Sequence, residues 1–195
     1  MWRQLQLTPP ANLADELHAA YNQQHRFYHG LQHLQECLSL LTQVEYLADQ
    51  PAEIALALYF HDAVYDTHAH DNEAQSAAWA SHVLLTCGAS AQRIERIHHL
   101  IMATCHQAQP DDADSQLLMD IDLAILGQNP ARFAEYEQQI RQEYSWVEAE
   151  AFRQGRMAVL KSFADREFIY NTGYFRQHFE QQARLNLQTA LAALS

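Results

Sequence analysis

The chain has 195 residues, 48% of them hydrophobic, which is enough to bury a substantial core and fits one domain of ordinary size. Twelve Lys and Arg residues against 24 Asp and Glu residues give a net charge of −12, which disfavours unassisted binding to nucleic-acid polymers or anionic lipid. No apolar run approaches the roughly 20 residues that cross a bilayer, so we expect neither a membrane-spanning segment nor a signal peptide.

The cysteine pattern indicates a reducing compartment. Cys37, Cys87 and Cys105 are odd in number and widely spaced, and none of them forms a CxxC pair. This pattern predicts neither a disulfide framework nor a thiolate zinc site. We therefore expect a cytoplasmic protein.

Apolar residues recur at helical spacing and Gly and Pro are scarce, so the chain is predicted to be all-α, with little or no sheet. Candidate helix caps and stops are Thr8-Pro9, Asp71, Gly88, Ser90, Gly127 and Asn129-Pro130. The helices are expected near residues 9–25, 29–48, 51–65, 72–87, 91–107, 115–126, 130–143, 147–164 and 172–193. The polar connections 67–71 and 107–114 are long enough to border a site.

The first histidine-rich segment is RFYHGLQHL, residues 26–34. His29 and His33 are four residues apart and His25 lies one turn earlier, so all three are expected on one helical face. This spacing suits metal ligands. For any one of them, a hydrogen-bonded core or surface histidine is the alternative.

The most informative segment is IALALYFHDAVYD, residues 54–66, where an apolar stretch ends in His61 and Asp62. A helix this apolar is expected to be buried, and a buried carboxylate is costly unless it is paired or bound to a metal. The alternative is that His61 and Asp62 cap the helix or bond each other and the nearby backbone.

A second pair of carboxylates lies in LLMDIDLAILG, residues 117–127. Asp120 and Asp122 are two residues apart in a predicted helix, so their side chains diverge and only one is expected to face a given site. Asp120 is also a plausible helix cap.

Together these residues resemble a known family. His33, His61-Asp62 and Asp122 match in order the H…HD…D signature of HD-superfamily phosphohydrolases. RFYHGLQHL, FHDAVYD, NEAQSA, IMATCH, LLMDIDLAILG, RQEYSWV and FRQGRMAVL resemble its predicted metal-dependent phosphohydrolases over roughly residues 25–170. The resemblance implies one compact multi-helix HD-type domain over 1–195, with the C-terminal helix 172–193 packed on its core.

The resemblance also implies a metal site of His33, His61, Asp62 and Asp122. His29 is the rival of His33 as a ligand, and Asp120 is the rival of Asp122. The ion is expected to be Mn, Fe, Co, Ni, Zn or Mg, with room for a second ion. Such an ion lowers the pKa of a bound water and polarises a phosphoryl oxygen, so a phosphomonoester or nucleotide-like substrate is expected.

Further residues are assigned roles around this site. Asp62 and Glu73 are the catalytic candidates, with Glu73 as an added acid or base. The candidates for substrate binding, chosen for charge or for proximity in sequence to the motifs, are Arg26, His29, Asp66, Asn72, His106, Arg153 and Arg156.

Two other functions compete with hydrolysis. Extra histidines, including His99 and His106, would suit an HD-fold di-iron oxygenase, and a domain that has lost turnover would serve as a non-catalytic ligand-binding module. The amphipathic C-terminal stretch is compatible with a monomer or a homodimer. We expect a small phosphorylated molecule as partner, and neither a nucleic-acid polymer nor a membrane.

Overall fold

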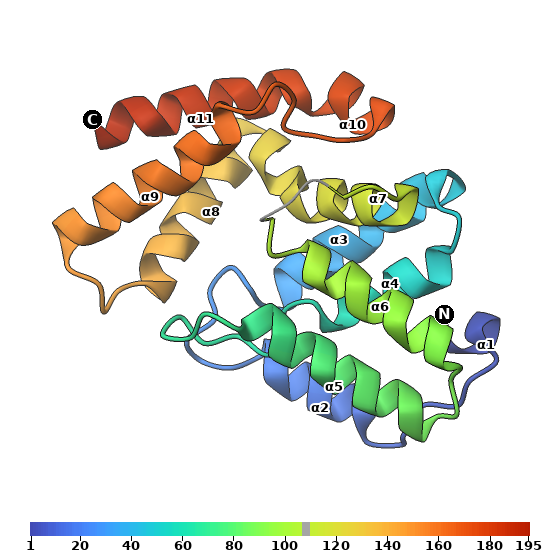
Figure 1. Cartoon of the computed structure of the whole chain (residues 1–195). Coiled ribbons are helices and arrows are strands. Elements are labelled where there is room, and N and C mark those ends of the chain that lie inside the picture. Colours follow the sequence, from blue (N-terminus) through green and yellow to red (C-terminus); the bar gives the residue numbers. More distant parts are fainter. Residues whose placement is uncertain (107–109) are drawn as a thin grey trace. The chain divides into compact units, whose positions relative to one another are not determined.

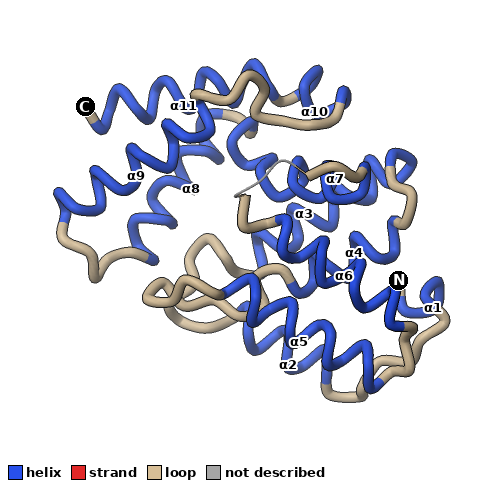
Figure 2. The backbone as a smooth tube through the Cα atoms, in the orientation of Figure 1, coloured by secondary structure: helices blue, strands red, loops and turns tan. Residues whose placement is uncertain are grey.

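Every regular element in the described part of the chain is a helix. The structure is a computed structural model that describes residues 1–106 and 110–195, and within these ranges it contains no strand (Figures 1 and 2). The prediction of an all-α protein is confirmed. Gln107, the expected last residue of the helix predicted at 91–107, lies outside the described residues, as does part of the connection 107–114.

The chain divides into two compact units, residues 1–121 and 122–195, and each is described by itself. The prediction of one domain over 1–195 stays a prediction. The helices of the first unit are α1 (Trp2–Leu5), α2 (Leu13–Tyr21), α3 (Leu31–Val44), the 3₁₀ helix η1 (Glu45–Leu47), α4 (Pro51–Phe60), α5 (Asn72–Thr86), α6 (Ala91–Ala103) and α7 (Ala113–Asp122, whose last residue opens the second unit).

Helix α4 is the central helix of the first unit. Ile54, Leu56, Ala57, Leu58 and Phe60 are all fully buried, as expected for a helix that is apolar on every side. It packs against α1, α3, α5 and α6. The buried position of α4 matters for function because its C-terminal end leads directly into the His61-Asp62 pair.

The N-terminus of α4 is held by side chains from other parts of the unit. Pro51 occupies the first helical turn, where its missing N–H costs no hydrogen bond. The Asp114 carboxylate accepts hydrogen bonds from the backbone N–H groups of Asp49 and Gln50, at 2.8 and 2.9 Å. Glu53, in the first turn, is buried and pairs with Arg93 and Arg96 of α6.

The second unit begins with the 3₁₀ helix η2 (Leu123–Gly127), followed by α8 (Pro130–Glu143), α9 (Ala149–Ala164), α10 (Gly173–His178) and α11 (Glu180–Leu194). Helix α11 packs against α9, α10 and η2. The Asn186 side-chain amide donates to the carbonyl oxygens of Leu126 and Gln128, both at 2.8 Å, and the Tyr170 hydroxyl donates to Leu123 O at 3.1 Å. The Asn186 bonds satisfy carbonyls at and just beyond the end of η2, and the Tyr170 bond satisfies the carbonyl of its first residue.

Most predicted helices form, with shifted ends. The cap predictions at Ser90 and Asn129 are confirmed, since each side chain accepts a hydrogen bond from the backbone N–H three residues on. Gly88 follows α5 in the left-handed conformation expected of a helix stop, at φ 77°. The helix expected from residue 9 instead begins at Leu13.

The helix expected at 172–193 is interrupted. Phe179 leaves helical geometry at φ −121°, so the segment forms α10 and α11 rather than one helix. The helix expected at 51–65 ends at Phe60, so His61 and Asp62 lie just beyond its last residue.

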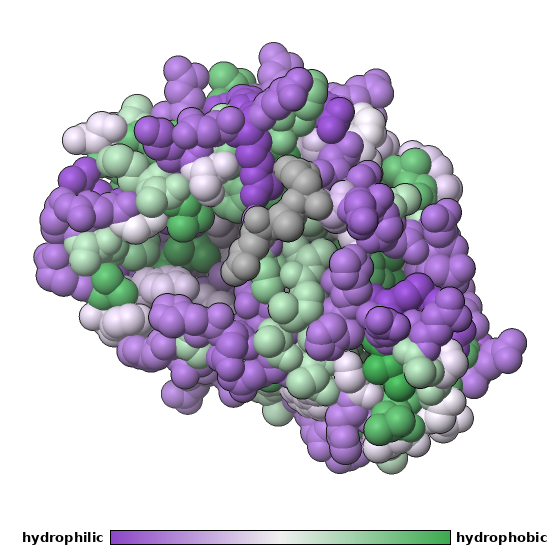
Figure 3. Space-filling view, viewed as in Figure 1, coloured by the Kyte–Doolittle hydropathy of each residue, from purple (hydrophilic) through white to green (hydrophobic). Residues whose placement is uncertain are grey.

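Polar side chains dominate the face of the molecule drawn in Figure 3, with apolar residues scattered between them. In the described part of the chain, no helix combines the length and the apolar character needed to span a membrane.

Candidate metal centre

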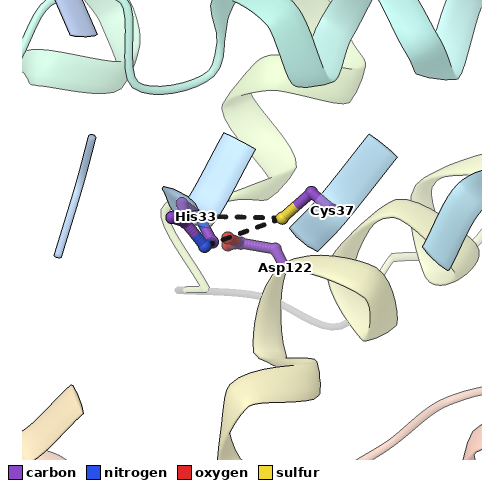
Figure 4. A group of neighbouring side chains, drawn as sticks. All are labelled: His33, Cys37 and Asp122. Carbon is purple, nitrogen blue, oxygen red and sulfur yellow. Dashed lines mark hydrogen bonds between the residues drawn. The ribbon is translucent and has the colours of Figure 1, made fainter. Parts of the chain in front are cut away.

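The start of α3 decides where His33 lies. Gly30 precedes the helix in an extended conformation, and a Cβ built there would lie 3.2 Å from the carbonyl oxygen of Tyr21, so the chain passes close to α2 before it turns helical. His33 is therefore the third residue of α3, and it is buried. Cys37 follows one turn later on the same face, and Figure 4 shows its sulfur next to the His33 ring.

His25 and His29 lie before α3, so the prediction that they share a helical face with His33 is wrong. They contact the site from a loop instead. The His29 ring stacks on Tyr65 at 4.3 Å between centroids, and it lies 6.1 Å from the His33 ring. His25 Nε2 lies 3.0 Å from the carbonyl oxygen of Tyr65.

His61 is oriented by the backbone of α4. Its Nδ1 lies 2.8 Å from the carbonyl oxygen of Leu58, which can only accept, so the proton is assigned to Nδ1. The lone pair is then on Nε2. A hydrogen bond of this kind to the second ring nitrogen is what orients most metal-binding histidines.

The donor atoms of His33, His61 and Asp62 converge. His61 Nε2 lies 3.1 Å from His33 Nε2 and 3.0 Å from Asp62 Oδ2, and His33 Nε2 lies 3.6 Å from the same oxygen. His61 is 1% exposed and His33 is 2% exposed, so bulk water does not reach these rings freely to supply a hydrogen-bond partner. His33, His61 and Asp62 are three of the four metal ligands that the family resemblance implies, and their binding of an ion stays a prediction.

These residues fit a divalent ion. Two ligands about 2.0–2.1 Å from a tetrahedral ion are separated by about 3.3 Å, close to the three donor distances. Asp62 Oδ2 is buried and has no hydrogen-bond partner among the described residues, although a buried carboxylate oxygen normally has one. A cation would satisfy it.

The electrostatics favour an ionised carboxylate. Burial acts to raise the pKa of Asp62, but positive charge on the imidazoles of His61, His29 and His33, when these rings are protonated, outweighs burial and holds that pKa far below its ordinary value. The Tyr21 hydroxyl accepts a hydrogen bond from Asp62 N at 3.3 Å, and burial together with the Asp62 charge raises the pKa of Tyr21. Tyr21 is therefore a neutral phenol next to the site.

Asp122 is the last residue of α7, and this helix carries it although the division into units falls just before it. It is half-buried, and one carboxylate oxygen lies within 4.8 Å of ligand atoms of His33 and Cys37 (Figure 4). Asp120, the rival, is fully buried two residues earlier. The choice of Asp122 stays a prediction.

Arg26 binds the backbone of this site. Its Nη1 donates to His29 O at 3.2 Å and to Asp62 O, and its Nη2 donates to Ala63 O at 3.0 Å. Its Nε donates to the side chain of Gln23. The guanidinium is buried and supports the loop that carries Asp62; its predicted substrate contact stays a prediction.

Several predicted site residues that follow His61 and Asp62 in sequence lie in a turn and at the start of α5. Asp66 N donates to the Asn72 side chain at 3.0 Å, and the Asn72 amide donates back to Asp66 O at 2.9 Å. Glu73 is the second residue of α5, and burial together with the Glu73 carboxylate raises the pKa of the Cys105 thiol. His106 follows α6 with a left-handed backbone, at φ 53°.

Arg153 and Arg156 belong to the second unit and have carboxylate partners there. Arg153 pairs with Glu150 one turn earlier on α9, and Arg156 is buried, pairs with Glu137 and lies over the Tyr136 ring. Their predicted role in substrate binding stays a prediction.

Two groups went unnoticed in the sequence. Cys37 was not among the predicted site residues, although its i, i+4 spacing from His33 was a usable signal. His99, Asp111 and Asp112 also bring ligand atoms within 4.8 Å of one another, at an exposed position where His99 Nε2 lies 3.4 Å from Asp112 Oδ2. Exposed acidic groups of this kind are common without a ligand.

Comparison with known proteins adds no assignment: no family model, no curated protein and no solved structure matches the chain.

Proposed function

We propose that the chain is a metal-dependent phosphohydrolase of the HD type, acting on a phosphomonoester or a nucleotide-like substrate. The observation that carries this proposal is the convergence of His33, His61 and Asp62 around a buried carboxylate oxygen without a hydrogen-bond partner among the described residues. The order of these residues in the sequence, with the resemblance described above, supports the same function.

In this proposal His33, His61 and Asp62 hold one divalent ion, with Asp122 as the predicted fourth ligand. Such an ion would supply a water of lowered pKa and a positive charge for a phosphoryl oxygen. The net charge of −12 makes that local charge necessary, because an anionic substrate would otherwise be repelled.

The surrounding residues have supporting roles. The Leu58 carbonyl keeps the proton of His61 on Nδ1, and Arg26 fixes the carbonyl oxygens of Asp62 and Ala63. Arg26 therefore acts as a positioning residue in this scheme. Glu73 remains our candidate for an additional acid or base. We also propose a cytoplasmic location, consistent with three cysteines that form no disulfide in the described part of the chain.

Removing a ligand tests the proposal. His61→Ala and Asp62→Ala are expected to lose bound metal and to reduce phosphate release at least about 100-fold, because each removes a donor of the ion. Metal content is measured by elemental analysis, and turnover with a panel of nucleotides and phosphorylated metabolites and several divalent ions.

His82→Ala is the matched control, since His82 is an exposed histidine of α5. It is expected to keep both metal and activity. If His61→Ala and Asp62→Ala fold, as judged by circular dichroism, and retain wild-type metal content and turnover, this site is not the active site.

A further inference from the structure

We propose that Tyr21 is a positioning residue for Asp62, one of the proposed metal ligands. Its hydroxyl and the Arg26 guanidinium hold the backbone on both sides of Asp62 and so aim the carboxylate at the two histidines of the site. This inference rests on the proposed function, because it concerns the ligands of the same ion. Neither the sequence motifs nor the family resemblance assigned a role to Tyr21.

Tyr21 lies directly behind the loop that carries Asp62. It is the last residue of α2 and is 2% exposed, and its hydroxyl oxygen accepts a hydrogen bond from Asp62 N at 3.3 Å. The Arg26 guanidinium lies over the Tyr21 ring, 5.4 Å from its centroid. The same guanidinium donates to Asp62 O and to Ala63 O, so the two side chains contact each other as well as the loop.

These hydrogen bonds fix the direction of the Asp62 side chain. Asp62 N belongs to the peptide group before its Cα atom, and Asp62 O belongs to the peptide group after it. The N–H of that second group, on Ala63, also donates to Phe60 O at 2.9 Å. Because each peptide group is planar, anchoring both of them fixes φ and ψ of Asp62. Only rotation of the side chain itself can then move its carboxylate away from the histidines.

The Tyr21 hydroxyl also affects His61. In a helix that continued beyond α4, Asp62 N would donate to Leu58 O, four residues earlier. Asp62 N donates to the Tyr21 hydroxyl instead, and Leu58 O lies 2.8 Å from His61 Nδ1. The hydroxyl thus replaces the helical acceptor at the point where α4 ends, and the Leu58 carbonyl orients the imidazole.

A buried tyrosine can also serve only to fill the core and to satisfy one backbone N–H group. That account predicts that Tyr21→Phe loses stability and binds metal as well as wild type does. A positioning role predicts weaker metal binding in addition. The two accounts therefore differ in a property that does not depend on catalytic activity.

The Zn²⁺ affinity of Tyr21→Phe distinguishes them. Zn²⁺ is titrated into the metal-free full-length protein in competition with a chromophoric chelator. We expect Tyr21→Phe to bind Zn²⁺ about tenfold more weakly than wild type, as is usual when a group that orients a metal ligand is removed. The visible d–d bands of bound Co²⁺, which report coordination geometry, are expected to differ between Tyr21→Phe and wild type.

Tyr170→Phe is the matched control. The Tyr170 hydroxyl is also buried and bonded to the backbone, since it donates to Leu123 O at 3.1 Å in the second unit. Both variants are expected to unfold at a lower urea concentration than wild type. Tyr170→Phe is expected to keep the Zn²⁺ affinity and the Co²⁺ spectrum of wild type.

The outcomes separate this inference from the proposed function. Wild type that binds no Zn²⁺ overturns both. If wild type binds Zn²⁺ and Tyr21→Phe binds it equally well, the role of Tyr21 is overturned and the metal site stands. An equal loss of affinity in Tyr170→Phe also overturns the role of Tyr21, because the effect would then follow from stability alone.

If Tyr21→Phe does not fold, amide hydrogen exchange in wild type decides. Coupling between two binding events is reciprocal, so an ion that is bound more tightly because Asp62 N is held must in turn strengthen that hydrogen bond. Zn²⁺ is therefore expected to slow exchange of the Asp62 N–H about tenfold and to leave the Asp49 N–H, before the other end of α4, nearly unchanged. An unchanged exchange rate at Asp62 contradicts the inference.

Discussion

At the scale of the residue, Glu53 shows how a buried charge is stabilised in this protein. Its carboxylate is 1% exposed and accepts hydrogen bonds from Arg93 Nε at 3.0 Å and from Arg96 Nε and Nη2 at 2.8 and 2.7 Å. Arg93 also donates to Leu5 O, so the same arginine links α1 to α6. Burial acts to raise the pKa of Glu53, but the two guanidinium groups lower it.

Glu53→Gln is expected to lower the free energy of unfolding by about 2 kcal/mol at neutral pH, less than for a fully buried ion pair because both arginines reach solvent. The folded-state pKa is depressed, so this stabilisation is complete above the unfolded pKa of about 4.3 and is lost as pH falls through the folded value. Urea unfolding from pH 7 to pH 3 measures the difference between variant and wild type.

The expected result is a constant difference above about pH 5 that narrows below about pH 4. Glu95→Gln, an exposed neighbour on α6, is expected to change stability by less than about 0.5 kcal/mol. A difference between wild type and Glu53→Gln that does not vary with pH would show that Glu53 is not held as a carboxylate.

At the scale of the element, the N-terminus of α4 depends on a side chain far along the chain. Asp114, the second residue of α7, accepts from two backbone N–H groups that precede α4. Burial, together with Asp49 and Asp112, raises the pKa of Asp114, so the charge itself is not favoured there. The hydrogen bonds are therefore the main contribution of this residue.

Asp114→Ala is expected to destabilise the protein by about 1 kcal/mol, the usual cost of losing a helix cap. Asp114→Asn keeps an acceptor and is expected to cost less. Thermal unfolding measures stability, and hydrogen exchange at Asp49 and Gln50 reports the lost bonds directly. Asp111→Ala, at a nearby exposed aspartate, serves as the control; an equal loss there would contradict the capping role.

Gly127 and Gly155, two glycines of the second unit, give a matched pair. A Cβ at Gly127, at the end of η2, would lie 2.8 Å from Phe179 Cβ and from Phe179 O, whereas one at Gly155, inside α9, would meet nothing within 4 Å. The backbone of Gly127 therefore packs directly against Phe179, the residue between α10 and α11.

Gly127→Ala is expected to destabilise the protein by about 1–3 kcal/mol, because a backbone carbonyl cannot move aside cheaply. Gly155→Ala is expected to stabilise it by up to about 1 kcal/mol, because alanine loses less conformational entropy in a helix interior. Chemical denaturation of both variants tests the pair. A Gly127→Ala protein as stable as wild type would show that η2 and Phe179 can separate without cost.

At the scale of the whole molecule, the sequence predicts helix type better than helix ends. The spacing of apolar residues predicts α8 with its correct bounds, because Asn129 and Pro130 mark its start chemically. The apolar spacing did not predict the break at Phe179, a residue that lies against Gly127, more than 50 residues away in sequence.

Some features of the candidate site could likewise be predicted from the sequence, and others could not. The sequence singled out His61 and Asp62 because a buried carboxylate needs a partner. It singled out His33 through the family resemblance. The orientation of His61 by Leu58 O, the use of Arg26 on the backbone and the approach of Cys37 depend on side-chain rotamers and loop paths. Local sequence does not encode these.

The loop after α4 is fixed by side chains from three other segments. Arg26 binds the carbonyl oxygens of Asp62 and Ala63, the Tyr21 hydroxyl accepts from Asp62 N, and the Ser76 hydroxyl accepts from Val64 N at 3.0 Å. Ordering one residue costs about 1–2 kcal/mol of conformational entropy. Here that entropy is lost during folding, so the ion that we propose would bind to a loop that is already ordered, and its affinity would carry little ordering penalty.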